Sequence, residues 1–210
     1  MNKAIIFDLD GTLWDTKNQT YLSFNNVLKM HGYDEVTKEK VSDNFGNSRE
    51  QSINHFFSTL PYEVADRLLE EIDNNIIDNL KNSSNYIYKG VTESLNLLSK
   101  KYNLYIVSNC AHKSYIESFL KAGNYYNYFK DYIAASSIPI SKSEAIEKII
   151  NDNNIEQAIY VGDTEKDKDA AESINIPFIQ CLYGFGKDLD CKYKINDISE
   201  LYESVEKAFN

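Results

Sequence analysis

An apolar run that ends abruptly in acidic residues constrains the fold of this chain more than any other feature of its sequence. Residues 4–7, Ala-Ile-Ile-Phe, are followed at once by residues 8–12, Asp-Leu-Asp-Gly-Thr. Four successive apolar residues are too few for a helix and show no polar alternation, so they predict a strand buried on both faces, as in a parallel sheet. Because open α/β sheets bind ligands at the carboxyl ends of their strands, we expect Asp8 and Asp10 at a ligand site.

The rest of the chain predicts a helical block followed by alternating helices and strands. Helical periodicity covers residues 16–31, 37–45, 48–59 and 62–80, and a polar tract at residues 81–85 is typical of a connector. Beyond it, strands are expected at residues 104–107, 132–135, 158–161 and 178–182, and helices at residues 91–101, 111–122, 143–151, 166–174 and 198–209. This alternation predicts an α/β fold, with a parallel sheet covered by helices on both faces.

The length of the chain favours one domain with an insertion, because 210 residues is long for a single minimal domain. We expect a core formed by residues 1–14 and 86–210. Residues 15–85 are expected to form an inserted all-helical domain, which we call the cap. Two linkers would join the cap to the core, and such a pair can act as a hinge.

Composition excludes some classes of partner. The chain carries 22 Lys and Arg against 32 Asp and Glu, a net charge of −10, which disfavours nucleic-acid binding because phosphate backbones attract positive charge. No apolar run approaches the roughly 18 residues typical of a membrane span, and no signal-peptide pattern precedes the first strand, so a cytoplasmic protein is expected. Cys110, Cys181 and Cys191 show no CxxC spacing, so neither a disulfide framework nor a zinc site is predicted.

Polar side chains follow the ends of three predicted strands. They are Asp8 and Asp10 after the first, Ser108 and Asn109 after the second, and Asp163 with Asp167 after the fourth, while Lys142 lies between the third strand and its helix. Parallel strands bring these ends to one edge of the sheet, so we expect the side chains to share one site.

These residues resemble the motifs of haloacid dehalogenase superfamily phosphohydrolases that carry a helical cap after the first strand. The family's first motif, Asp-x-Asp-Gly-Thr, matches residues 8–12, and its fourth, Gly-Asp-x-x-x-Asp, matches residues 162–167. Ser108 matches the second motif and Lys142 the third, although Ser143 stands where the family often has proline. The resemblance covers essentially the whole chain and implies a Rossmann-like parallel core, similar to the phosphoglycolate phosphatase branch.

The chemistry of such a site requires a cation. A phosphate monoester is a dianion, and two like unit charges about 4 Å apart repel by roughly 4 kcal/mol at an effective dielectric constant near 20. Hard oxygen ligands with no neighbouring His or Cys favour Mg²⁺. The resemblance implies a metal site formed by Asp8, Asp10 through its backbone carbonyl, and Asp163, with Asp167 either as a further ligand or as a residue that orients the ligands.

The resemblance also implies a covalent mechanism. Asp8 would attack phosphorus to give an aspartyl phosphate, which water then hydrolyses. Asp10 would protonate the leaving oxygen and then deprotonate that water. Ser108, Asn109 and Lys142 would bind the phosphate oxygens. The predicted function is therefore Mg²⁺-dependent hydrolysis of a small phosphorylated metabolite by a monomer or small homo-oligomer.

Alternatives from the sequence remain for several residues. Ser108 with Asn109, and Asp163 with Thr164, are also typical helix caps, and Lys142 can be a solvated surface lysine. In the cap, Arg49 is a possible substrate contact, whereas Ser48 with Gln51 forms a capping-box pattern. The three histidines, His31, His55 and His112, are interpreted as structural or surface residues.

Three other functions are compatible with the same motifs. A sugar phosphomutase, which is an isomerase, would return the phosphoryl group to its substrate. A 2-haloacid dehalogenase would use the same nucleophile on carbon but would not need Asp10. A non-catalytic phosphate-binding module is disfavoured because every catalytic position is filled.

Overall fold

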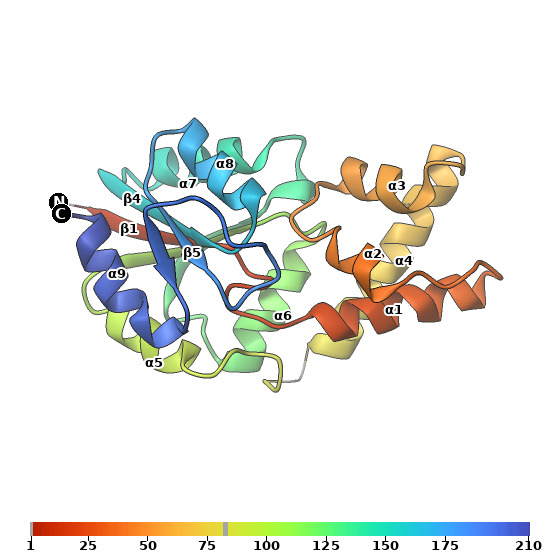
Figure 1. The fold of residues 1–210 in the computed structure, drawn as a ribbon, viewed down its shortest axis with the longest axis horizontal. Coiled ribbons are helices and arrows are strands. Elements are labelled where there is room, and N and C mark those ends of the chain that lie inside the picture. Colours follow the sequence, from red (N-terminus) through yellow and green to blue (C-terminus); the bar gives the residue numbers. More distant parts are fainter. Residues whose placement is uncertain (1, 82–83) are drawn as a thin grey trace.

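The computed structural model describes residues 2–81 and 84–210 and contains a six-stranded, wholly parallel sheet (Figure 1). The strand order is β3-β2-β1-β4-β5-β6. The strands are β1 (Lys3–Phe7), β2 (Asn103–Ser108), β3 (Phe129–Ala134), β4 (Gln157–Gly162), β5 (Phe178–Cys181) and β6 (Tyr193–Ile195). The α/β fold predicted from the sequence is confirmed. Of the expected connector at residues 81–85, residues 82 and 83 lie outside the described residues.

β1 lies at the centre of the sheet because its apolar residues can be buried on both faces. Residues 4–7 have no exposed surface, and β1 pairs with β2 on one side and with β4 on the other. Phe7 is level with Ile106 of β2 and with Val161 of β4. The residues that follow these three strands therefore emerge at the same edge of the sheet.

Helices cover both faces of the sheet (Figure 1). On one face lie α5 (Val91–Leu98), α6 (Lys113–Gly123) and α9 (Leu201–Ala208), and on the other lie α7 (Lys142–Asp152) and α8 (Glu165–Ser173). Successive side chains of a strand point to opposite faces. Accordingly, Ile5 and Phe7 belong to the larger hydrophobic core, whereas Ala4 and Ile6 pack in the smaller core with α7 and α8.

Four further helices lie beyond the carboxyl edge of the sheet (Figure 1). They are α1 (Lys17–Met30), α2 (Lys38–Ser42), α3 (Arg49–Phe57) and α4 (Tyr62–Leu80). The apolar stripe of α4, including Leu68 and Ile72, is buried in the larger core, and Phe24 of α1 packs on Phe56 of α3 with ring centres 4.3 Å apart. The predicted capping box of Ser48 and Gln51 is present at the start of α3.

The two segments that join these four helices to the sheet run side by side. The Asp15 amide donates a hydrogen bond to the Tyr86 carbonyl (2.7 Å), and the Tyr88 amide donates to the Leu13 carbonyl (3.2 Å). An isolated antiparallel bridge also joins Trp14 to Ile87. We therefore propose the domain boundary at these segments, with a core of residues 1–14 and 86–210 and a cap of residues 15–85.

Some element boundaries differ from those predicted. β6 was not predicted, because its three residues lie in a polar stretch with no apolar run. β3 starts at Phe129 rather than at residue 132, since exposed Lys130 and Asp131 on this edge strand break the apolar pattern. The closing helix is divided into a 3₁₀ turn (Ile198–Glu200) and α9. Within the described ranges, no helix is long and apolar enough to cross a membrane.

Candidate active site

Three buried carboxylates and one buried ammonium group meet at the carboxyl edge of the sheet. Ligand oxygens of Asp8, Asp163 and Asp167 lie within 4.8 Å of one another. Lys142 Nζ donates to Asp8 Oδ1 at 2.8 Å and also to Asp167 Oδ1. Lys142 is only 6% exposed, so its interpretation as a solvated surface lysine is wrong. These four residues, separated by up to 159 positions, meet because the strands are parallel.

Local hydrogen bonds orient two of the carboxylates. Asp167 is the third residue of α8 and completes the capping box that begins at Thr164, and its Oδ2 accepts from the amides of Asp163 (3.2 Å) and Thr164 (2.9 Å). Asp163 Oδ2 accepts from the amides of Phe185 (2.6 Å) and Gly186 (3.1 Å), which lie in the loop after β5. The helix-cap alternative is thus correct for Thr164, and the same cap positions Asp167.

Gly11 allows the turn after β1 to approach this cluster. Its φ of +79° lies in the left-handed region, and a Cβ atom at this position would lie 2.3 Å from Asp163 Oδ2. Glycine alone combines that conformation with that close approach.

In Asp8 and Lys142, burial and the opposite charge beside each group shift the pKa in opposite directions. Burial raises the pKa of Asp8 to about 7 against the opposing effect of Lys142, and it raises the pKa of Asp163 well above its usual range. Burial alone would lower the pKa of Lys142, but Asp167 and Asp8 raise it well above its ordinary value. When all three are ionised, the carboxylates outnumber the single ammonium, and a purely carboxylate donor set of this size fits Mg²⁺.

Asp10 is held apart from that cluster by two hydroxyl groups. Thr16 Oγ1 and Tyr115 Oη both donate to Asp10 Oδ1, at 2.5 and 2.6 Å. Burial raises the pKa of Asp10, while the bonds from Thr16 and Tyr115 lower it. Asp10 is not part of the group formed by Asp8, Asp163 and Asp167, although it lines the same cavity as Asp8.

Sequence reasoning missed the two partners of Asp10. Tyr115 is one of 16 tyrosines in the chain and belongs to no motif, so nothing in the sequence distinguishes it. Thr16 was expected only as the start of a helix, and it is the N-cap residue of α1 but makes no side-chain capping bond.

Ser108 and Asn109 end β2 beside this site, and neither caps the next helix. Ser108 is buried and lines the same cavity as Asp8. Asn109 Nδ2 donates to the Gly46 carbonyl of the helical block at 2.9 Å. The N-cap residue of α6 is His112, so the capping alternative for Ser108 and Asn109 is wrong.

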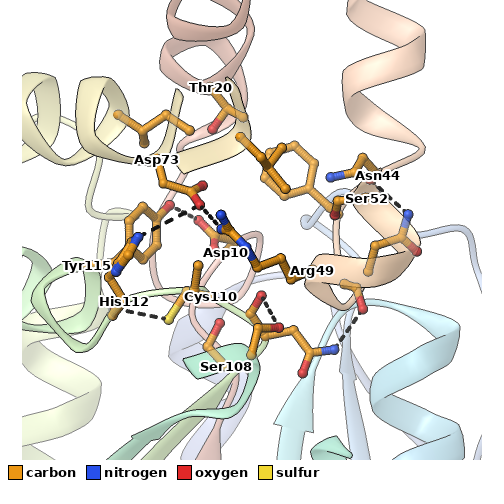
Figure 2. A pocket seen from close by; sticks show the side chains of 18 of the residues that line it. Asp10, Thr20, Asn44, Arg49, Ser52, Asp73, Ser108, Cys110, His112 and Tyr115 are labelled. Atoms are coloured by element: carbon orange, nitrogen blue, oxygen red, sulfur yellow. Dashed lines mark hydrogen bonds and ion pairs between the residues drawn. The ribbon is translucent and has the colours of Figure 1, made fainter. Parts of the chain in front are cut away.

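A cavity of about 110 Å³ lies between the sheet edge and the four helices (Figure 2). Asp8, Asp10 and Ser108 line it from the sheet side. Arg49, Asp73 and several apolar side chains line it from the helical side. Its size and position suit a small molecule placed directly over Asp8.

Arg49 contacts three acidic residues of α4, of which Asp73 also lines this cavity (Figure 2). Its Nε lies 2.7 Å from Asp66 Oδ1, and its Nη1 and Nη2 lie 3.0 Å from Asp73 Oδ2 and 3.3 Å from Glu70 Oε2. His112 Nε2, from the core, lies 3.1 Å from Glu70 Oε2 and 4.0 Å from Asp73 Oδ2. The interpretation of His112 as merely structural missed that it lines the cavity.

Residues 5–181 match the model of the haloacid dehalogenase-like hydrolase family. Among curated proteins, the chain is 26% identical over 215 residues to a phosphoglycolate phosphatase of Rhodobacter capsulatus, and the match covers 98% of each chain.

Solved structures share the fold. A predicted phosphoglycolate phosphatase of Haemophilus somnus superposes with a TM-score of 0.85 at 20% identity, covering 97% of this chain and 98% of the other. A β-phosphoglucomutase of Clostridium difficile superposes with a TM-score of 0.82 at 20% identity, covering 100% of this chain and 98% of the other. At these identities the likeness establishes the fold alone.

Proposed function

The chain belongs to the haloacid dehalogenase-like hydrolase family, and from that membership we propose that it is a Mg²⁺-dependent phosphatase that hydrolyses a small phosphate monoester. The observation that carries the proposal is the buried group of Asp8, Asp163 and Asp167, joined by Lys142, in which Asp8 lines a small cavity. Burying a carboxylate cluster of this kind costs folding free energy, and such clusters are typical of functional sites.

The three carboxylates would hold the metal, with the Asp10 backbone carbonyl as a further ligand. Bound Mg²⁺ would neutralise their negative charge and that of the substrate phosphate, so that the two anions can approach each other. Asp163 is oriented for this role by the amides of Phe185 and Gly186. Asp167 is held both by its helix cap and by Lys142.

Asp8 is the proposed nucleophile. Its carboxylate oxygen would form a bond to phosphorus while the bond to the leaving oxygen breaks, giving an aspartyl phosphate and a free alcohol. Lys142 bonds Asp8 Oδ1, which opposes the effect of burial and favours the charged, nucleophilic form of Asp8. Ser108, Asn109 and Lys142 would stabilise the charge on the phosphate oxygens during transfer.

Asp10 is the proposed general acid and base. It would give its proton to the leaving oxygen in the first step and take one from the attacking water in the second. That water attacks phosphorus, breaks the bond to Asp8 and releases inorganic phosphate. Thr16 and Tyr115 fix the direction of the Asp10 carboxyl group throughout.

The proposed cap would close over the substrate and exclude water. Several contacts join it to the core, and three of them lie around residues 45–47. The rings of Phe45 and Phe185 lie 4.4 Å apart, Asn109 bonds the Gly46 carbonyl, and Lys166 bonds Asn47.

The phosphomutase alternative is less well supported. A mutase must hold a second phosphate dianion away from Asp8, which requires positive charge on the cap side of the cavity. Among the described residues that line the cavity, Arg49 is the only Lys or Arg, and it is already paired with three carboxylates. The dehalogenase alternative is also less well supported, because a dehalogenase would not need Asp10.

A phosphate-release assay over small phosphorylated metabolites tests the proposal. It includes 2-phosphoglycolate because the Rhodobacter capsulatus relative is named a phosphoglycolate phosphatase. We expect release that requires Mg²⁺, stops with EDTA and returns when Mg²⁺ is added back. Asp8→Asn should lower the rate of phosphate release at least about 10³-fold, because no other group can replace the nucleophile. Undiminished turnover in EDTA or in Asp8→Asn would refute the covalent, metal-dependent phosphatase.

A further inference from the structure

Arg49, on the cap side of the cavity, is surrounded by three carboxylates, and the resulting excess of negative charge restricts the substrate. Resting on the proposed phosphatase function, we infer that the substrate's leaving group carries hydroxyl or amino hydrogen-bond donors and no carboxylate. This differs from phosphoglycolate, the substrate in the curated relative's name.

Arg49 is the one Lys or Arg among the cavity-lining residues of the described cap, and its guanidinium is already paired. Its guanidinium contacts Asp66, Glu70 and Asp73, and its side chain is 19% exposed. An incoming carboxylate would have to displace one of these partners. It would also become a fourth negative charge around a single positive one.

Asp73 presents an acceptor to the cavity. It lines the cavity beside Ile76 and Ile77 and bonds Arg49 through one oxygen (Figure 2). Burial raises the pKa of Asp73 to about 6. At about pH 7.5 the group is therefore ionised, and it favours a hydroxyl or ammonium donor over an anion.

His112 does not reverse this balance. It lies close to Glu70 and Asp73, so any positive charge that it carries is shared with the same carboxylates. With His112 protonated, the carboxylates around Arg49 still outnumber the two cations.

The same ligand atoms do not favour a second metal ion. Glu70, Asp73 and His112 bring ligand atoms within 4.8 Å of one another, but Arg49 already contacts both carboxylates. A divalent ion would have to displace the guanidinium from both. A hydroxyl or ammonium group needs only one free acceptor position.

Three two-carbon phosphates that differ in one terminal group test the inference in the Mg²⁺-loaded enzyme. They are 2-phosphoglycolate with a carboxylate, 2-hydroxyethyl phosphate with a hydroxyl, and O-phosphoethanolamine with an ammonium. We expect kcat/KM for the hydroxyl and ammonium compounds to exceed that for 2-phosphoglycolate by at least about tenfold, because like charges juxtaposed in a site cost affinity. p-Nitrophenyl phosphate serves as a reference whose leaving group has neither donor nor carboxylate.

Two variants of α4 then test whether the lining of the cavity causes this substrate preference. Asp73→Asn should narrow the preference at least about fivefold, since it removes a lining negative charge and the charged partner of Arg49 Nη1, which a substrate carboxylate could then contact. Glu71→Gln removes one negative charge from the same helix, but Glu71 pairs with exposed His31. This control should leave the ratio unchanged.

The outcomes separate the inference from the proposed function. Hydrolysis in which 2-phosphoglycolate equals or exceeds the other two compounds overturns the inference and leaves the phosphatase intact. No hydrolysis of any compound, p-nitrophenyl phosphate included, overturns both. A preference that is the same in Asp73→Asn and Glu71→Gln would contradict the assignment to Asp73.

Discussion

At the scale of single residues, the two acids after β1 differ because their neighbours differ. Asp8 faces an ammonium group and two carboxylates, whereas Asp10 faces two hydroxyl groups. The first environment suits a metal ligand and nucleophile, and the second suits a group that gives and takes a proton. Tyr115, on α6, is the partner of Asp10 that no motif predicts.

Tyr115→Phe removes one of the two donors that orient Asp10. General acid catalysis matters most when the leaving oxygen is basic, so we expect kcat to fall about tenfold for an alkyl phosphate and less than about threefold for p-nitrophenyl phosphate. Steady-state kinetics on both substrates measure this difference.

Tyr132→Phe is the matched control, because the Tyr132 hydroxyl bonds Glu117, outside the cavity. It should leave both rates unchanged. Equal losses on the two substrates in Tyr115→Phe would show that Tyr115 supports the fold and not the proton transfer.

At the scale of elements, the sequence predicted what depends on local apolar pattern. Residues 4–7, 104–107 and 158–161 were recognised as strands because each is an uninterrupted apolar run that ends in polar residues. β6 has no such run, and its position depends on pairing with β5, which is a tertiary contact. The turn at Gly11 was predicted as a motif, but its closeness to Asp163 was not.

Gly11→Ala tests whether that turn supports the metal site. The alanine Cβ would collide with the Asp163 carboxylate, so we expect loss of activity and at least about tenfold weaker Mg²⁺ binding by calorimetry.

Gly32→Ala is its control, because Gly32 has a similar φ of +72° and no atom lies within 4 Å of the place that an alanine Cβ would take. It should cost about 1 kcal/mol of unfolding free energy for the left-handed conformation and keep full activity. Normal Mg²⁺ binding in Gly11→Ala would contradict the role given to the turn.

At the scale of the whole molecule, the site depends on contacts between cap and core that the sequence could not reveal. The motifs located Asp8, Asp163 and Asp167 because the family resemblance and the strand ends fix them. The pairing of Arg49 with α4 arises when the helices of the cap pack against one another, and the position of His112 beside it arises when those helices pack over the sheet edge. The substrate preference inferred above depends on these side chains.

Phe45→Ala weakens the proposed closure of the cap by removing its ring contact with Phe185. We expect KM to rise and kcat/KM to fall about tenfold, since a cap that closes less often holds substrate and excludes water less well. Tyr62→Ala, which removes an exposed aromatic side chain of the cap, should leave both constants unchanged. Identical kinetics in the two variants would argue against closure through Phe45.

The central claim is that Asp8 carries the phosphoryl group during turnover. The enzyme is quenched with acid while it hydrolyses a saturating substrate in Mg²⁺. Borohydride then reduces any aspartyl phosphate to homoserine, and peptide mass spectrometry locates the homoserine. We predict homoserine at position 8, and none in enzyme treated with EDTA or lacking substrate. Continued turnover with aspartate intact at position 8, or with the modification at another residue, would contradict the mechanism.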